Sequence, residues 1–239
     1  MRKFFLAFGT LLAGFGTYTY FTLPNVANLK KENPQLTALM RQRDDEGRAA
    51  GKKVRRSQIW LPYSAIPSHL KSAVLIAEDD AFYQHEGYDL DQIKESFIKN
   101  WEKKGFVRGG STITQQLAKN LYLSTSRNPL RKIREFLIAR RLEAELSKRR
   151  ILEIYLNVIE WGDGVYGAEA AARAHFSKPA KELTIREAAM LAAMIPSPRR
   201  WDPKQPTRRL RQRCELILSR MHQYRHISDA EFDHATQTP

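Results

Sequence analysis

The sequence predicts a mainly α-helical protein, and three observations lead to this prediction. Apolar residues recur at helical spacing through most of the chain after residue 63. Helix-start signatures precede several of these stretches, as in Thr112 with Gln115 and in Thr184 with Glu187. Runs that alternate between apolar and polar residues, which would indicate strands, are scarce. A chain of 239 residues accommodates one such domain, whereas two large domains would be a tight fit.

The first expected element is a membrane-spanning helix over 1–23. After Arg2 and Lys3, residues 4–23 form a run of 20 positions without a charged side chain, which is long enough to cross a bilayer. A cleaved signal peptide is the alternative, but its apolar core is normally shorter and ends in a cleavage motif that this run lacks. We therefore expect an uncleaved signal anchor, with the rest of the chain exported.

A polar segment of mixed charge follows over 24–56, and we expect it to form a stalk. Its composition offers few apolar residues at helical spacing, and a short extended lead-in over 58–63 connects it to the helical part. Asn128 before a proline predicts the start of a long helix, and two prolines at 196 and 198 end the helix that begins after Thr184. The turn-rich stretch 161–167 predicts a break. Helices are expected over about 70–81, 90–103, 111–121, 129–147, 148–158, 168–175, 184–195 and 206–223. The arginines of the last helix are expected to face solvent. This helix begins a C-terminal helical tail over 206–239.

The charge of the chain indicates an anionic partner. Lysine and arginine number 40 against 26 aspartate and glutamate, a formal net charge of +14. Nucleic acid, phospholipid headgroups and a phosphorylated substrate all fit this excess, and charge alone does not choose among them. The single cysteine, Cys214, excludes an internal disulfide framework and a cysteine-rich metal site.

The first candidate for a functional site is the run 109–120, which places amides, hydroxyls and a lysine at the opening of a helix. Gln116 and Lys119 are three positions apart and share one polar face. A lysine near a helix N-terminus favours an anionic ligand, because the exposed N–H groups and the helix dipole attract negative charge as well. Taken alone, the run fits an ordinary well-capped surface helix as well as it fits an anion-binding site.

The second candidate, residues 77–89, crowds carboxylates against aromatic residues and His85. Glu78 lies at the edge of an apolar stripe, where lost solvation raises the pKa of a carboxyl and suits it to general acid or base work. An acidic helix end in water is the alternative. His85 is interpreted as a structural hydrogen-bonding group rather than a metal ligand, since a lone histidine more often has a structural role.

The third candidate lies over 127–135, where cations gather at a helix N-terminus and so oppose the helix dipole. A bound phosphate or pyrophosphate would neutralise both, with Arg127, Lys132 and Lys119 converging on it. Glu135 is then expected to be partly buried among cations, and an ordinary surface pair with Arg131 is the alternative. Farther along, the polar residues at 153 and 157 share a face and are interpreted as structural, holding the loop that follows them.

Four motifs occur in order along the chain. They read Glu78-Asp79-x-x-Phe82-x-x-His85-x-Gly87, Gly110-Ser111-Thr112-Ile113-Thr114-Gln115-Gln116-x-x-Lys119-Asn120, Arg131-Lys132-x-x-Glu135 and Ile151-Leu152-Glu153-x-Tyr155-Leu156-Asn157. With these motifs, the chain resembles the peptidoglycan glycosyltransferases of glycosyltransferase family 51, most closely the monofunctional members, over about 59–203.

The resemblance implies a lysozyme-like glycosyltransferase domain over 57–205, behind a single N-terminal transmembrane helix. The domain would have a larger head lobe and a smaller, membrane-touching jaw lobe at about 90–109. The reaction it implies is polymerisation of lipid II into glycan strands for the bacterial cell wall. An undecaprenyl-pyrophosphate-linked chain is the donor, and the GlcNAc 4-hydroxyl of lipid II attacks it with inversion.

The resemblance also assigns roles to residues of this chain. Glu78 would be the base, and Glu135 the second essential carboxylate. The remaining positions would bind the donor, with Lys119, Arg127 and Lys132 on the pyrophosphate and Ser111 and Gln116 on sugar or phosphate. The transpeptidase domain of bifunctional relatives is expected to be absent.

The expected location is the bacterial inner membrane, crossed once, with the catalytic domain in the periplasm. Lipid II, the lipid-linked glycan and membrane lipids are the expected partners, and nucleic acid is not. No dedicated metal ligands stand out, so a requirement for Mg²⁺ or Mn²⁺ is left open, as are contacts with division or elongation proteins. Two alternatives remain at this point, a lytic glycosidase of lysozyme-like fold and a noncatalytic scaffold or nucleic-acid binder.

Overall fold

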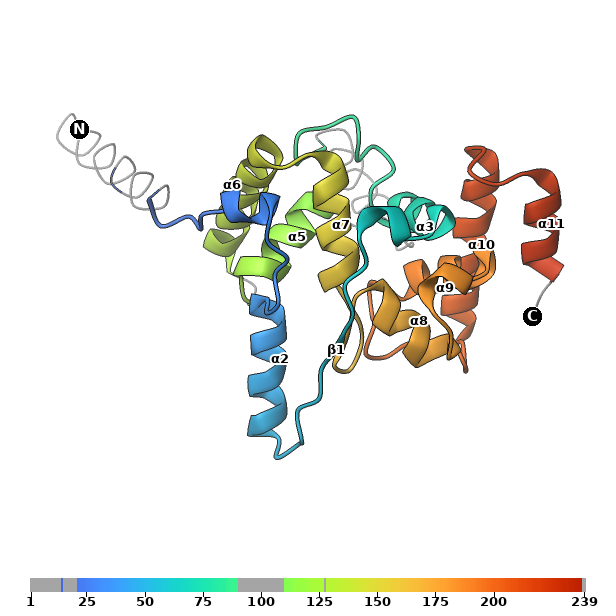
Figure 1. The fold of residues 1–239 in the computed structure, drawn as a ribbon, viewed down its shortest axis with the longest axis horizontal. Coiled ribbons are helices and arrows are strands. Elements are labelled where there is room, and N and C mark those ends of the chain that lie inside the picture. Colours follow the sequence, from blue (N-terminus) through green and yellow to red (C-terminus); the bar gives the residue numbers. More distant parts are fainter. Residues whose placement is uncertain (1–13, 15–20, 90–109, 127, 238–239) are drawn as a thin grey trace, which may run out of the picture.

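The computed structural model describes residues 14, 21–89, 110–126 and 128–237, and these residues are mainly helical, as predicted (Figure 1). The expected jaw at 90–109 and nearly all of the expected spanning helix lie outside them. Within the described ranges, no helix combines the length and apolar character needed to cross a membrane. The helices are α2 (Ala38–Ala49), α3 (Ser68–Glu78), α5 (Ile113–Tyr122), α6 (Pro129–Glu145), α7 (Lys148–Val158), α8 (Ala168–Phe176), α9 (Ile185–Met194), α10 (Arg208–Gln223) and α11 (Asp229–Gln237), with short 3-10 turns η1 (Ala27–Lys30), η2 (Tyr63–Ala65) and η3 (Ala180–Glu182) and strands β1 (Ser57–Gln58), β2 (Glu160–Gly162) and β3 (Val165–Tyr166).

The predicted helix starts are confirmed by their hydrogen bonds. Thr112 and Gln115 form a capping box, in which the Thr112 hydroxyl accepts from the backbone N–H of Gln115 and the Gln115 side chain accepts from that of Thr112. Thr184 and Glu187 do the same at α9. The Asn128 side chain caps α6 through the N–H at position 130. Each cap satisfies N–H groups that the first helical turn leaves without partners.

The segment 24–56 is not the polar stalk that the sequence predicted. It contains α2, which packs against α5, and it contributes Val26, Leu29 and Met40 to the common hydrophobic core. Arg43 on α2 also forms a hydrogen-bonded ion pair with Glu160 of β2, in which its Nε lies 3.1 Å from one carboxylate oxygen. The segment has a polar composition because only one narrow face of α2 is buried, while the rest meets solvent.

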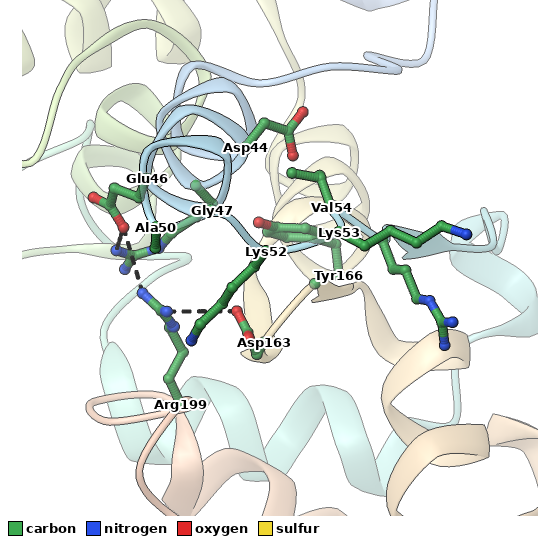
Figure 2. Close-up of a pocket in the computed structure, with 13 residues that line it drawn as sticks. Asp44, Glu46, Gly47, Ala50, Lys52, Lys53, Val54, Asp163, Tyr166 and Arg199 are labelled. Atoms are coloured by element: carbon green, nitrogen blue, oxygen red, sulfur yellow. Dashed lines mark hydrogen bonds and ion pairs between the residues drawn. The ribbon is translucent and has the colours of Figure 1, made fainter.

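A cavity of about 280 Å³ lies where the end of α2, residues 52–55 and the β2–β3 turn meet (Figure 2). Arg199 spans its rim, with one terminal nitrogen 3.4 Å from Glu46 and the other 3.5 Å from Asp163. The Tyr166 ring forms part of its wall. These ion pairs connect α2 to the β-hairpin and to the loop after α9.

The turn-rich stretch 161–167 forms a β-hairpin rather than an irregular break. β3 is the central strand of a three-stranded sheet, antiparallel to β2 and parallel to the lead-in strand β1. Trp161 on β2 is fully buried, and its indole N–H donates to the carbonyl of Leu191 at 2.9 Å. The hairpin thereby anchors the lead-in strand and α9 to one core.

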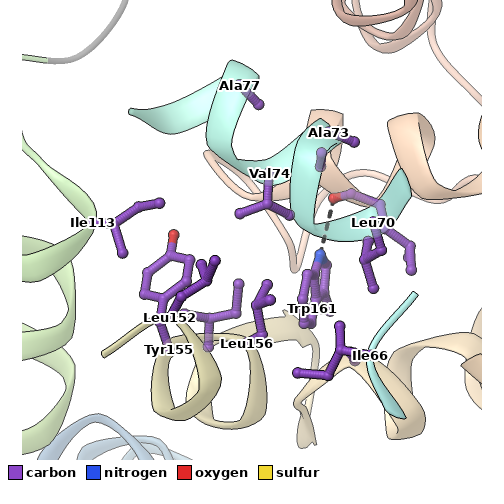
Figure 3. Close-up of a cluster of buried hydrophobic side chains, with 14 of the residues drawn as sticks. Ile66, Leu70, Ala73, Val74, Ala77, Ile113, Leu152, Tyr155, Leu156 and Trp161 are labelled. Atoms are coloured by element: carbon purple, nitrogen blue, oxygen red, sulfur yellow. Dashed lines mark hydrogen bonds between the residues drawn. The ribbon is translucent and has the colours of Figure 1, made fainter. Parts of the chain in front are cut away.

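The core gathers side chains from helices that are far apart in the sequence (Figure 3). Leu70 and Val74 of α3 lie over Leu156 of α7 and the Trp161 indole, and Leu152 lies on the same side of α7, one turn before Leu156. All five are fully buried. This packing sets the position of α3, whose last residue belongs to the candidate site.

The C-terminal segment 206–237 is part of the same domain, since α10 packs against α9 and α3, and α11 against α10 and α9 (Figure 1). The expectation that its arginines all face solvent is wrong for Arg213, whose side chain is only 8% exposed. Arg213 shares the buried stripe of α10, three positions after Leu210 and four before Ile217. Arg213 is buried because of its position on the core-facing side of α10, although arginine is a residue type that is usually exposed.

Replacing Trp161 by alanine should lower the free energy of unfolding by about 3–5 kcal/mol, because it leaves a large cavity and an unpartnered Leu191 carbonyl. Urea denaturation followed by circular dichroism measures this change. Tyr224→Ala is the control, because that side chain is 51% exposed. A loss for Trp161→Ala no larger than that of the control would contradict the role of Trp161 in the core.

Candidate active site

A buried carboxylate joins the end of α3 to the start of α5. Asp79 directly follows the last residue of α3 and is fully buried. Its carboxylate accepts the backbone N–H of Ile113, the first residue of α5, at 2.9 Å, and lies 3.0 Å from Nε2 of His85. The Gly87 N–H donates to Nδ1 of His85 at 3.1 Å, so the ring proton resides on Nε2 and points to Asp79.

The loop after α3 is fixed to α5 at a second point. The Thr112 hydroxyl donates to the Gly87 carbonyl at 2.8 Å. Gly87 has φ +90°, and a Cβ there would lie 3.1 Å from Cγ of Glu143, so both backbone and space favour glycine. The interpretation of His85 as a structural hydrogen-bonding group is confirmed by these contacts.

Glu78 is held by donors from two other helices. Its Oε2 accepts from the Gln116 amide at 2.8 Å, and its Oε1 accepts from the Arg213 guanidinium at 2.9 Å. The Tyr155 hydroxyl donates to the Gln116 carbonyl oxygen at 2.9 Å, which fixes the amide so that its NH₂ faces Glu78. Burial raises the pKa of the Tyr155 phenol well above its ordinary value, so the hydroxyl keeps its proton. The Glu78 side chain is 12% exposed, so solvent still reaches it.

A second cluster joins α6 to the start of α5. Glu135 is 3% exposed and pairs with both Arg131 and Lys132. The Lys132 ammonium also donates to the Ser111 hydroxyl at 3.0 Å. The alternative of an ordinary surface pair between Arg131 and Glu135 is wrong, because the carboxylate is buried and has two cationic partners.

Lys119 lies between these two groups of residues. Burial lowers the pKa of its ammonium, and the nearby Arg131 and Lys132 lower it further, while Glu135 and Glu78 act in the opposite direction. A half-buried cation with cationic neighbours favours an anion, since a bound anion would relieve both desolvation and repulsion. Of the predicted site residues, only Arg127 lies outside the described part of the chain. The others belong to one of the two groups or, in the case of Lys119, interact electrostatically with the carboxylates of both.

The arrangement suits two kinds of chemistry. A carboxylate held on both oxygens and open to solvent can accept a proton from a bound hydroxyl group. Cations fixed beside it, with Lys119 and Lys132 foremost, can stabilise negative charge that develops on a leaving group. In the described part of the chain, no group of three or more histidine, cysteine, aspartate or glutamate residues is placed to hold a metal ion. The cavity beside α2 is lined by none of the predicted site residues.

Sequence reasoning missed Arg213 and gave Asp79 no role of its own. Arg213 was detectable as a charged residue on the apolar stripe of α10. The structural roles predicted for Glu153 and Asn157 are confirmed, but they hold the preceding lead-in rather than the following loop. Glu153 accepts the N–H of Tyr63 at 3.1 Å, and the Asn157 amide pairs with both backbone groups of Leu61.

The family model and the curated relatives that match this chain indicate the same family. The family model described as Transglycosylase matches residues 46–222. Proteins named biosynthetic peptidoglycan transglycosylase are similar over most of the chain. The one from Nitrosospira multiformis is 44% identical over 92% of this chain and 96% of its own length, and the one from Aromatoleum aromaticum is 50% identical over 79% and 82%.

Among solved structures, penicillin-binding protein 1A from Haemophilus influenzae matches with a TM-score of 0.46 and 22% identity. The match covers 78% of this chain and 18% of that one.

Replacing Lys119 by methionine should leave the protein as stable as the wild type, or more so, at neutral pH. When folding lowers the pKa of a lysine, its positive charge destabilises the folded state at every pH below the pKa that it has in that state. That cost fades as the pH rises from the folded pKa toward the ordinary value of 10.5, because the native lysine then loses its proton. Any gain of the variant should therefore shrink toward about pH 11.

Urea denaturation across this pH range measures the effect, with the exposed Lys181→Met as the matched control. A variant clearly less stable than wild type at neutral pH would show that the Lys119 ammonium stabilises the fold instead.

Proposed function

The chain belongs to the transglycosylase family, and we propose that it is a peptidoglycan glycosyltransferase that polymerises lipid II into glycan strands of the bacterial cell wall. The family match over residues 46–222 and the similarity to biosynthetic peptidoglycan transglycosylases support this proposal. The observation that carries it furthest is the Glu78 carboxylate, held on both oxygens beside the half-buried cation Lys119.

In the proposed reaction, Glu78 takes the proton of the GlcNAc 4-hydroxyl of lipid II. The oxygen forms a bond to C1 of the donor MurNAc as the bond from C1 to the pyrophosphate oxygen breaks. The electron pair of that bond leaves with undecaprenyl pyrophosphate, and attack from the opposite face inverts the configuration from α to β. A carboxylate that is ionised and aimed before the substrate binds lowers the cost of the proton transfer.

The cations would act on the leaving group. We assign Lys119, Lys132 and Arg127 to the pyrophosphate, where fixed positive charge lowers the barrier as negative charge develops. Glu135 would keep Lys132 in place, in line with its direct pairing to that ammonium. Ser111 would bind donor sugar or phosphate beside Lys132.

Gln116 would combine two tasks. Its amide already donates to Glu78 and accepts from Tyr155, so it positions the base in addition to contacting the donor.

A membrane location is part of the proposal, because the donor carries a lipid chain. Three large apolar side chains on α6 are exposed at helical spacing, Leu130, Ile133 and Phe136, and Phe21 is exposed as well. Arg134 on α6 bonds to the carbonyl of Thr22, which ties this helix to the end of the predicted anchor. We propose that this face meets lipid, with the anchor in the inner membrane and the domain in the periplasm.

We propose transglycosylation without transpeptidase activity, in line with the name of the Nitrosospira multiformis relative, which refers to transglycosylation alone. No step of the proposed reaction is routed through a metal ion. Among the described residues, no group of three or more histidine, cysteine, aspartate or glutamate residues is placed to hold one.

Glu78→Gln should abolish glycan synthesis while the protein stays folded, because an amide cannot take the hydroxyl proton. The full chain in detergent is incubated with lipid II, with and without a chelator, and products are separated by gel electrophoresis. Glu86→Gln is the matched control, since this neighbouring side chain is 84% exposed.

Normal polymerisation by Glu78→Gln would rule out Glu78 as the base. Release of soluble fragments from finished peptidoglycan, with no use of lipid II by the wild type, would instead support a lytic glycosidase.

Lys119→Met should lower kcat by about 100-fold or more, the usual effect of removing one fixed group that stabilises developing charge. The same lipid II assay measures this, with Lys181→Met as the control. A kcat within about twofold of the wild type would place the pyrophosphate away from Lys119.

A further inference from the structure

Arg213 is a permanently charged group on an otherwise apolar helix face. Leu210, Cys214 and Ile217 are buried beside it on α10, and its own side chain is 8% exposed. A guanidinium stays protonated at any physiological pH. Burial of that charge is costly unless a partner of opposite charge and further acceptors compensate for it. The groups that face it therefore explain why an arginine stands here.

Its partners lie at the C-terminal end of α3, 135 positions earlier in the chain. One terminal nitrogen donates to Oε1 of Glu78 at 2.9 Å and makes a longer contact of 3.4 Å with the carbonyl of Ala77. The last turn of a helix carries carbonyls without intrahelical partners and the negative end of the dipole, so a cation is favourable there. Arg213 thus binds both the last turn of α3 and its final side chain.

The second oxygen of Glu78 is engaged from the opposite direction by Gln116. Donors on both oxygens remove the rotation of the carboxylate and favour its ionised form, because an ionised carboxylate accepts hydrogen bonds on both oxygens and a protonated one on fewer sites. Gln116 supplies a neutral donor, whereas Arg213 supplies a full charge. The two contacts therefore differ in what they contribute: Gln116 orients the carboxylate, and Arg213 orients it and also balances its charge.

We propose that Arg213 is a positioning residue that keeps Glu78 ionised and aimed for the transfer reaction, so that the C-terminal helix α10 completes the active site. This inference rests on the proposed role of Glu78 as the base. It also gives the C-terminal segment a function beyond covering the core, because α10 brings a cation into direct contact with Glu78.

The other groups around Glu78 determine in which direction the loss of Arg213 shifts the pH dependence of activity. Lys119 on α5 is a second cation that acts on it at longer range, Tyr155 on α7 is a neutral phenol, and Asp79 is a neighbouring carboxylate bound to His85 and to a backbone N–H. Loss of Arg213 removes a positive charge in direct contact with Glu78 and leaves Asp79 in place. Glu78 would then take up a proton at higher pH, and activity would fall earlier as the pH is lowered.

The test compares Arg213→Met, Arg213→Lys and the matched control Arg208→Met in the full chain, where Arg208 is an exposed residue of the same helix. The assay is lipid II polymerisation, with kcat, KM and the pH profile as readouts. For Arg213→Met we expect kcat to fall about 10- to 100-fold with KM within about threefold. We also expect the acid limb of its kcat profile to move up by about one pH unit or more. Arg213→Lys keeps the charge, so its acid limb should stay near that of the wild type.

A folded Arg213→Met with the kcat and pH profile of Arg208→Met would overturn the proposal. So would a loss of activity that follows lost thermal stability alone, with the acid limb unmoved. If Arg213→Met fails to fold, Arg213→Gln takes its place, because it keeps a hydrogen-bond donor and removes the charge. An acid limb that moves up by about one pH unit in the folded Arg213→Gln supports the proposal, and an unmoved acid limb contradicts it.

The wild type and Glu78→Gln separate this test from the proposed function. If the wild type makes no glycan, or if Glu78→Gln does, the assigned function or base is wrong. If both behave as expected and the Arg213 variants match the control, only the role of Arg213 is wrong.

Discussion

The buried Asp79 carboxylate is the constraint on which the candidate site depends. Because Asp79 is removed from water, its charge requires strong donors, and the structure supplies them from the first N–H of α5 and from His85. These bonds place the end of α3 against the start of α5. Glu78 is the residue immediately before Asp79, so the bonds that satisfy the buried Asp79 carboxylate also determine where the Glu78 carboxylate lies.

The remaining groups of the site follow from this junction. Once α5 starts at this point, its periodicity puts Gln116 against Glu78 and Lys119 one turn further on. The contact between Lys132 and Ser111 then connects α6 to the same helix start. The base and the cations are thus both held by α5 and the residue before its N-cap, and α5 is a rigid element rather than a loop. A reaction that needs a base and a charged leaving group a few ångströms apart benefits from such rigidity.

Much of the fold was predictable from the sequence, since helix caps and apolar stripes depend on residues at most four positions apart. The capping boxes at Thr112 and Thr184 are examples. The stalk and the solvated tail were wrong for a common reason. Both α2 and α10 are rich in charged residues and bury only a narrow stripe of apolar side chains. Their average composition therefore does not indicate that they pack against the core. Residue-level reasoning also left Glu78, Lys119 and Glu135 with simple surface alternatives, and only the ordered family motifs joined them.

The sequence by itself determined the helical character of the chain, the starts of its helices and its membership of the transglycosylase family. Each of these depends on local spacing or on ordered motifs that can be read along the chain. The tertiary structure alone decided that Arg213 contacts Glu78, that Asp79 joins two helices, and that the segment 24–56 is part of the core. These contacts link residues tens to more than a hundred positions apart, and which of them form depends on how the helices pack together around one core.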